Sequence, residues 1–405
     1  MLFAPGFIDE ADRFQLTGDM LRITFPYIFF IALTAFAGGI LNSYNQFAVP
    51  AFTPVLLNLC LIVAAVWVSP YFEQPVMALA WGVAAAGITQ LLFQFPFLLK
   101  LKLMPRPRYK KNHQGVSQII RLMIPAIIGS SVAQINLLFD TIIASFLVAG
   151  SVSWLYYSDR LVEFPLGILG IALATVILPS LSKHHARKSK EEFNQTLDWA
   201  LRLVLLVAIP AATGLLLLAG PLLATLFNYG EFNLNDAEMA SMSLMAYALG
   251  LPAFVIIKIL APGYYARQDT KTPVRIAIKS MIANMFLNVL FVVPMVLLSI
   301  PGPHTGLALA TSASAYMNAW LLYRGLRQQN IYTPRAGWGA HWFYLLGSNL
   351  IMAGFLFYFS PQLTTWNSWL LSERITYLLG FVILAACIYF ITLFLLGLRP
   401  KHIQK

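Results

Sequence analysis

Charged residues are scarce in this chain, and their scarcity excludes an ordinary soluble protein. Only 11% of the 405 residues are Asp, Glu, Lys or Arg, whereas a soluble domain has about 25%. Hydrophobic residues make up 59% of the chain, and its mean hydropathy is +0.72. This composition predicts an all-α, polytopic helical membrane protein with several spans.

Cysteine is almost absent, and the sequence lacks the motifs of metal and nucleotide chemistry. Cys60 and Cys387 lie in separate apolar segments, so we expect neither a disulfide nor a metal site. None of the six histidines belongs to an HExxH motif or to a ligand-spaced cluster with cysteine. The sequence has no phosphate-binding glycine loop and no visible pair of nucleophile and base. We therefore predict no cofactor, no ATP-driven step within this chain and no enzymatic activity.

Apolar segments recur along the chain, each near the ~20 residues that a bilayer span needs. Eleven of them are predicted to be transmembrane helices. These helices are expected at 19–42, 52–70, 76–99, 118–148, 152–182, 194–220, 237–260, 273–298, 304–325, 341–360 and 373–398.

The positive charge is confined to alternate loops. A net charge of +11 would suggest nucleic-acid binding in a soluble protein, but here the basic residues gather in the loops at 100–117, 183–193, 261–272 and 326–340 and in the C-terminal tail. The opposite set of loops holds one basic residue, Arg374. The positive-inside rule therefore places the C-terminus in the cytoplasm and the first residues outside, and no nucleic-acid partner is expected.

One apolar segment carries a cluster of charges, in the stretch SVSWLYYSDRLVEFP at 151–165. Helical spacing places Tyr156, Asp159, Arg160 and Glu163 on one face. An ionised side chain facing lipid costs roughly 3 kcal/mol by insertion scales. The cluster therefore predicts a substrate or ion site in a wet cavity. The alternative is a structural ion pair in which the two carboxylates hold Arg160.

Two further charged residues are candidates for the same site. Asp140, in the preceding apolar segment, is a candidate cavity acid and a candidate carrier of a proton or cation. Lys258 lies toward the cytoplasmic end of its span, where we expect it either to contact an arriving substrate or to extend to the interface.

The chain contains a weak internal repeat. The acidic stretch at 10–12 corresponds to that at 236–238, and Pro26 corresponds to Pro252. Both sites are external loops that lead into a helix with an early proline. By this correspondence the second unit has six helices and the first only three. Because such repeats are normally complete, about 110 residues and three helices are expected ahead of Met1.

The repeat predicts two pseudo-symmetric lobes, the first of them incomplete. An even number of helices in a complete unit makes the repeats parallel, related by an axis along the membrane normal. The expected parts are an N-terminal lobe of three helices, a basic cytoplasmic linker, a C-terminal lobe of six helices, and two extra helices with a basic tail: 1–99, 100–117, 118–325 and 326–405.

Five stretches spread over nearly the whole chain carry a family resemblance. They are APGF at 4–7, FPYI at 25–28, GGILNSYNQFAVPAFTPVLLN at 38–58, SFLVAGSVSWLYYSDRLVEFPLGILGIALATVILPSLSK at 145–183 and ILAPGYYARQDTKTPVRIAI at 259–278. The chain resembles the MurJ/MviN family, the lipid II flippases of bacterial peptidoglycan synthesis.

The resemblance implies a fold and an activity. The fold is that of the multidrug/oligosaccharidyl-lipid/polysaccharide exporter superfamily, with two six-helix lobes and two further helices. The activity is movement of lipid II, an undecaprenyl-diphosphate-linked muropeptide, from the inner to the outer leaflet of the bacterial inner membrane by alternating access, in support of cell wall synthesis and cell shape. Expected partners are lipid II, membrane lipids and cell-wall synthesis proteins. A proton, another monovalent cation or the membrane potential is the expected energy source.

The resemblance also bears on the charged face. The arginine of the YYSDRLVEFP stretch, Arg160 here, is among the family's required cavity charges. We expect Arg160 to bind the diphosphate through its planar donor fork, with Asp159 and Glu163 holding it in the empty state and Tyr156 contacting sugar or peptide. The family's other required charges lie on its first two helices, which have no counterpart here, so activity of this chain by itself is an open question.

Three alternatives remain at this point. A drug/cation antiporter of the same superfamily would want an acid-rich first lobe, which the basic loops and Arg160 disfavour. A polysaccharide-unit flippase shares the physics, and only the specific stretches argue against it. The third is a membrane scaffold that recruits cell-wall enzymes without transporting anything.

Overall fold

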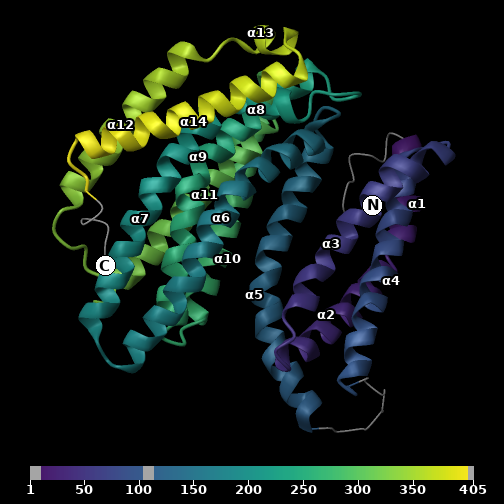
Figure 1. Cartoon of the computed structure of the whole chain (residues 1–405), viewed down its shortest axis with the longest axis horizontal. Coiled ribbons are helices and arrows are strands. Elements are labelled where there is room, and N and C mark those ends of the chain that lie inside the picture. Colours follow the sequence, from purple (N-terminus) through teal and green to yellow (C-terminus); the bar gives the residue numbers. More distant parts are fainter. Residues whose placement is uncertain (1–10, 104–113, 400–405) are drawn as a thin grey trace. The chain divides into compact units, whose positions relative to one another are not determined.

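The computed structural model describes residues 11–103 and 114–399, and every regular element in these ranges is a helix (Figure 1). The chain divides into two compact units, Phe7–Arg121 and a larger unit that includes Leu122–Lys405. The boundary lies inside α5. The predicted linker at 100–117, the first residues and the end of the basic tail lie largely outside the described residues.

The smaller unit is built around α4, which contacts α1, α2 and α3. Its chain breaks at Phe25–Pro26, so that the predicted span at 19–42 becomes two helices. Proline lacks the amide hydrogen that would continue the ladder, which accounts for the break. The helices of this unit are α1 (Ala11–Thr24), α2 (Tyr27–Ser43), α3 (Ala48–Val63) with a π turn (Ala64–Val68) and a 3₁₀ turn (Ser69–Tyr71), α4 (Val76–Lys100) and the start of α5 (Gln114–Ser145).

The larger unit has α9 at its centre, in contact with α6, α7, α8 and α11 (Figure 1). The last long helices, α12 and α14, run side by side and pack on α7 and α8. The helices are α6 (Ser151–Ala186), α7 (Lys190–Leu217), α8 (Ala219–Leu226), α9 (Leu234–Tyr265), α10 (Lys271–Leu297), α11 (Thr305–Gln328), α12 (Trp338–Phe359), α13 (Leu363–Ser368) and α14 (Leu371–Leu395).

The predicted spans are helical in the structure, which also contains short helices that were not predicted. Each of the eleven predicted spans coincides with helix, and eight helices in the described residues are long and apolar enough to cross a membrane. The predicted spans at 118–148, 152–182 and 304–325 are helical as α5, α6 and α11. The short helices α8 and α13 were not expected from the sequence.

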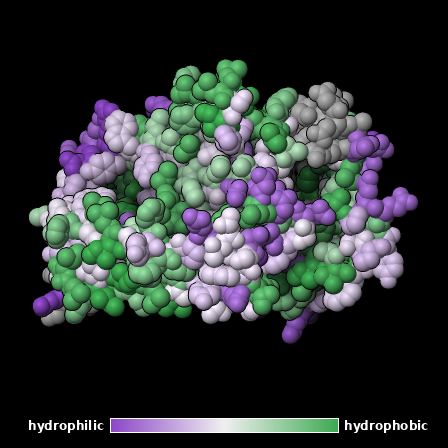
Figure 2. Space-filling view, turned by 90° about the horizontal axis from the view of Figure 1, so that it is seen from above, coloured by the Kyte–Doolittle hydropathy of each residue, from purple (hydrophilic) through white to green (hydrophobic). Residues whose placement is uncertain are grey.

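The surface carries many large apolar side chains, as the space-filling view shows (Figure 2). Phe286 of α10, Leu350 of α12 and Phe394 of α14 are each about two-thirds exposed, at 67%, 70% and 66%. In water such a surface would aggregate. It suits helices that face lipid tails.

Small residues bring α9 and α11 close together. A Cβ atom added to Gly250 would lie 2.9 Å from the Cα of Ser312, whose hydroxyl donates to the Ala246 carbonyl at 2.7 Å. Lipid is as apolar as a leucine side chain, so helices in a bilayer associate through close packing and hydrogen bonds of this kind. The central position of α9 therefore depends on Gly250.

Replacing Gly250 by alanine is predicted to lower the free energy of unfolding by about 1–3 kcal/mol, because the new methyl group meets backbone that cannot move aside. Thermal unfolding of the purified protein measures the effect. Gly354→Ala on α12 is the matched control, since a Cβ there meets nothing within 4 Å. Equal stability of the two variants would contradict the packing argument.

Candidate functional site

The charged stretch lies on α6, and the start of this helix is fixed by a close contact. Gly150 has a left-handed backbone (φ 103°), and a Cβ there would lie 2.6 Å from the Trp154 ring. One turn on, the buried Ser158 hydroxyl lies 2.7 Å from the Ala240 carbonyl of α9. The Ser158 face of α6 is thereby held against α9, which leaves Arg160 on the outer side.

Arg160 and Glu163 form an ion pair, with Nη1 and Oε2 2.5 Å apart. Both side chains are half-exposed, at 53% and 51%. The guanidinium carbon also lies 4.8 Å from the centre of the Tyr156 ring, in a cation–π contact. Arg160 is therefore oriented from two directions while its remaining donors stay accessible.

Asp159 differs from this pair in burial. Among the residues that the structure describes, Glu163 forms the ion pair with Arg160, and Asp159 interacts electrostatically with both of them. Asp159 is partly buried and also interacts electrostatically with Asp140 of α5. Buried Tyr247 of α9 interacts electrostatically with both acids. Asp159 therefore interacts with an accessible ion pair and with a more enclosed acid.

Asp140 is held in a polar cluster formed by three helices. Its carboxylate accepts from the Asn288 amide of α10 at 2.5 Å and from the Asn136 amide of its own helix at 3.3 Å. Asn288 also donates to Asn284 at 3.0 Å. The Asn284 amide in turn lies 3.3 Å from the Thr311 hydroxyl of α11.

The cluster presents oxygen atoms that have no protein donor. The side-chain carbonyl oxygens of Asn136 and Asn288 are buried and lack a hydrogen-bond partner within the described part of the chain. Together with the Asp140 carboxylate they are the hard oxygen groups that cations such as Ca²⁺ and Mg²⁺ prefer. The arrangement can hold a proton on Asp140 or a small cation between the oxygens.

Lys258 is on the same unit but away from Arg160. Its aliphatic stem packs on Gly170 of α6, where an added Cβ would lie 3.3 Å from the Lys258 Cγ. Gly170 follows Arg160 by ten residues, about 15 Å along the helix. Lys258 of α9 therefore contacts α6 about three turns away from Arg160, and the two cations do not form one site.

Arg160 is among the residues that line an apolar groove of about 610 Å³. Helices α6, α7, α8, α12 and α14 supply its walls. Arg160 is the one charged residue among the described residues that line it, which include Phe164, Pro210, Gly214, Leu218, Leu222, Met352, Leu356, Ala386, Tyr389 and Phe390. The groove thus combines one cationic group with a hydrocarbon lining.

Sequence reasoning missed the partners of Asp140. Asn284 and Asn288 are one turn apart in the apolar helix α10, and Asn136 is one turn from Asp140. That i, i+4 spacing was the available signal, because it places two polar groups on the same helix face. The Arg160 groove could not be predicted in this way, because the residues that line it have the same apolar pattern as any membrane-spanning helix.

The chain matches known proteins over nearly its whole length. A model of the family described as "Lipid II flippase MurJ" matches residues 1–379. The chain belongs to the lipid II flippase MurJ family. It is 48% identical to a probable MurJ of Vibrio cholerae, over all of this chain and 77% of the relative. It is 45% identical to that of Haemophilus influenzae, over 97% of this chain and 77% of the relative.

Solved structures agree with the MurJ family assignment. A structure titled "Lipid II flippase MurJ, inward closed conformation" superimposes with a TM-score of 0.78 at 27% identity, covering 96% of this chain and 76% of that chain. An inward-facing multidrug transporter of the MATE family has a TM-score of 0.63 at 14% identity, over 77% of this chain and 71% of that one. The latter likeness is one of fold, which places the MurJ fold near that of multidrug exporters.

Asp140 and Asn288 are predicted to be energetically coupled, because each leaves the other's buried polar group unpaired when it is removed. A double-mutant cycle of Asp140→Ala and Asn288→Ala, followed by unfolding in detergent, is expected to give about 0.6–1.7 kcal/mol of coupling. The pair Asp140→Ala with Gln195→Ala, in the first turns of α7, is the control. Coupling no larger than the control's would mean that the cluster is not a unit.

Proposed function

We propose that this chain moves lipid II from the inner to the outer leaflet of the bacterial inner membrane, as a transporter and not as a catalyst. Family membership and the related proteins named lipid II flippase support the substrate. The observation that carries the mechanism is the presence of Arg160 in the lining of the 610 Å³ apolar groove. A lipid-linked diphosphate has this same pattern, with an anionic group joined to a long hydrocarbon chain.

In this proposal the diphosphate takes the place of Glu163 on Arg160. The guanidinium carries five N–H donors in a planar fork that suits phosphate oxygens. In the empty state Glu163 neutralises this charge at 2.5 Å, and the Tyr156 ring keeps the fork oriented. Because both partners are half-exposed, the exchange requires no opening of a buried pair. Tyr156 then lies where the sugar or peptide would contact it.

The groove takes part of the polyprenyl chain. Its lining is almost entirely apolar, and burial of each methylene group contributes about 0.8 kcal/mol. The tail therefore stays in a hydrocarbon environment while the headgroup crosses. Walls from α12 and α14 give the two helices beyond the repeat a direct role in holding substrate.

Coupling to an ion belongs at Asp140 in this scheme. The enclosed oxygens of Asp140, Asn136 and Asn288 suit a proton or a monovalent cation. Asp159 links this cluster to the helix that carries Arg160, since it interacts electrostatically with Asp140. Neutralising Asp140 would change the field at Asp159, one residue from Arg160. The membrane potential acts on such a charge with ~2.3 kcal/mol per 100 mV.

The proposed topology places the C-terminus and the basic loops in the cytoplasm. Lys258, on the cytoplasmic side of Arg160, then meets the anionic headgroup before Arg160 does. Lys258 is exposed, and the point where its stem meets α6, at Gly170, lies about 15 Å along that helix from Arg160. Such a position suits a first contact.

Substitution of Arg160 tests the diphosphate role. Arg160→Lys keeps the charge but loses the fork, so the transport rate is expected to fall about tenfold, and Arg160→Ala is expected to reduce it further. The measurement is lipid II accessible on the outer leaflet of cells depleted of their own flippase, at equal expression. Arg275→Lys, at an exposed position of α10, is the control.

A purely structural ion pair predicts another result. It would give loss of folded protein in Arg160→Ala, and recovery of that protein when Glu163 is also replaced. If both Arg160 variants transport like the parent, the diphosphate role is wrong. If the parent itself moves no lipid II while reaching the membrane, the substrate assignment is wrong.

The groove is tested by chain length. Gly214 lines it with open space around its Cα, so Gly214→Leu is expected to displace two to three methylene groups at a cost of roughly 2 kcal/mol. Binding of the undecaprenyl substrate should weaken, whereas an analogue with a short prenyl chain should bind as before. Gly380→Leu, in open space on α14 and outside the lining, is the control. Equal loss for both chain lengths would contradict a tail site.

A further inference from the structure

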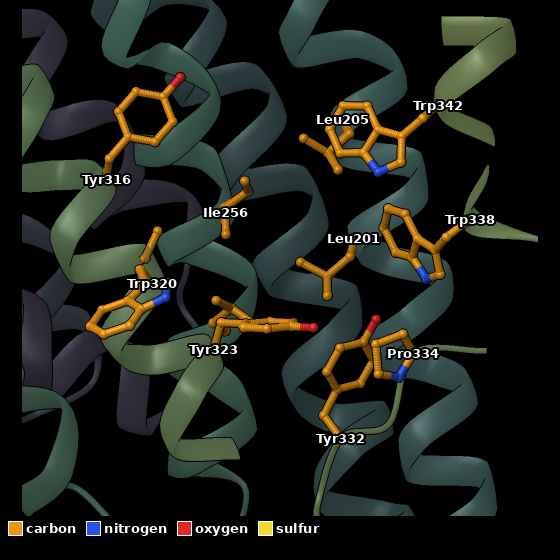
Figure 3. A pocket seen from close by; sticks show the side chains of 12 residues that line it. Leu201, Leu205, Ile256, Tyr316, Trp320, Tyr323, Tyr332, Pro334, Trp338 and Trp342 are labelled. Atoms are coloured by element: carbon orange, nitrogen blue, oxygen red, sulfur yellow. The ribbon is translucent and has the colours of Figure 1, made fainter. Parts of the chain in front are cut away.

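A second groove, separate from the Arg160 groove, is lined by aromatic rings. Its volume is about 460 Å³, and it lies between α11 and the start of α12, with α7 and α9 behind (Figure 3). Tyr316, Trp320 and Tyr323 come from one face of α11, and Trp338 and Trp342 face them from α12. The inner wall is aliphatic, with Leu201, Leu205 and Ile256.

A buried carboxylate fixes the α12 wall of this groove. Asp198 of α7 is 3% exposed, and its Oδ1 accepts from the Tyr332 hydroxyl at 2.7 Å and from the Trp338 indole nitrogen at 2.8 Å. Arg202 binds the other carboxylate oxygen at 2.8 Å. The polar ends of the two rings are thus turned inward, and their apolar faces are presented to the groove. The groove is therefore preformed.

Two arginines stack on rings of this groove, and they differ in how many of their N–H donors are already bound. Arg202 stacks on Trp338 and is engaged by Asp198 and by the carbonyls of Arg335 and Ala336. Arg324 stacks on Trp320, with its guanidinium carbon 5.1 Å from the ring centre, and is exposed. It has no carboxylate partner among residues 11–103 and 114–399. Its donors are available beside an apolar groove.

We propose that this aromatic groove binds an anionic phospholipid of the inner leaflet, with an acyl chain along the rings and the phosphate on Arg324. The leaflet assignment rests on the topology proposed above, in which the last turns of α11 and the first turn of α12 are cytoplasmic. Tyrosine and tryptophan favour that interface, because one end of each ring is apolar and the other polar. Basic pockets between helices on this side bind anionic headgroups.

The charge at the groove selects the anionic phospholipid over other occupants. A zwitterionic phospholipid also carries a phosphate, but its headgroup ammonium would meet the positive charge of Arg324 and Arg202. An organic cation, which aromatic rings alone would attract, would meet Arg324 and Arg202 at the same rings. The two grooves share walls on α7 and α12, but no residue lines both, so bound lipid and lipid II would occupy different sites.

Quenching of tryptophan fluorescence by brominated lipids tests the proposal on the purified chain in nanodiscs. In phosphatidylcholine discs, dibrominated phosphatidylglycerol is expected to reach half-maximal quenching at a roughly fivefold lower mole fraction than dibrominated phosphatidylcholine, the factor for one cationic contact. The preference should be lost in Arg324→Gln and kept in Arg327→Gln, an exposed arginine one turn away.

The source of the quenching locates the lipid. Replacing Trp320 and Trp342 together by phenylalanine should lower the phosphatidylglycerol-specific part to what Trp338 reports, whereas Trp67→Phe with Trp81→Phe in the smaller unit should leave it unchanged. Equal quenching by the two lipids, equal loss in Arg324→Gln and Arg327→Gln, or a specific part that the Trp320 and Trp342 replacements do not lower would each overturn the proposal. The discs contain no lipid II, so failure of transport and failure of this site are read separately.

Discussion

An ionised side chain inside a bilayer persists only where protein or water replaces the hydration it has lost, and the larger unit is arranged around this constraint. On α6 the cost is met for Arg160, which is neutralised by Glu163 and stacked on Tyr156 while remaining half-exposed. The more buried Asp159 interacts electrostatically with Arg160 on its own helix and with Asp140 on α5. Asp159 therefore connects the electrostatics of the accessible ion pair with that of the enclosed acid.

Both grooves of the larger unit follow a common physical plan. Each combines an apolar lining with one guanidinium group: Arg160 lines the first groove, and Arg324 stacks on Trp320 of the second. Arginine suits such a position, because its flat and weakly hydrated head stacks on an aromatic ring and still offers donors to phosphate. The grooves differ in the carboxylate near the arginine. Glu163 forms an ion pair with Arg160, whereas Asp198 forms one with Arg202, and Arg324 remains accessible.

Much of the architecture follows from local sequence. Each predicted span is helical in the structure, since continuous apolar segments of this length allow little else in lipid. The sequence marked Pro26 as a bend, and the structure shows a turn at Phe25–Pro26 between α1 and α2. The short helices α8 and α13 could not be predicted, because short segments fold according to what covers them. Trp366 of α13, for example, is fully buried and bonded to Thr225 of α8.

The sequence by itself determined the membrane class, the family and the position of the charged stretch on α6, because these depend on composition and on neighbours within one helix. Only the tertiary structure decided that Glu163 forms the ion pair with Arg160 while the more buried Asp159 also interacts electrostatically with Asp140. Both carboxylates are within reach of the arginine along the helix, and helix packing sets how far each is buried. Tertiary structure also joined Asp140 to Asn288, 148 residues away, and enclosed the two grooves. Their walls come from helices whose apolar faces look alike until they are packed together.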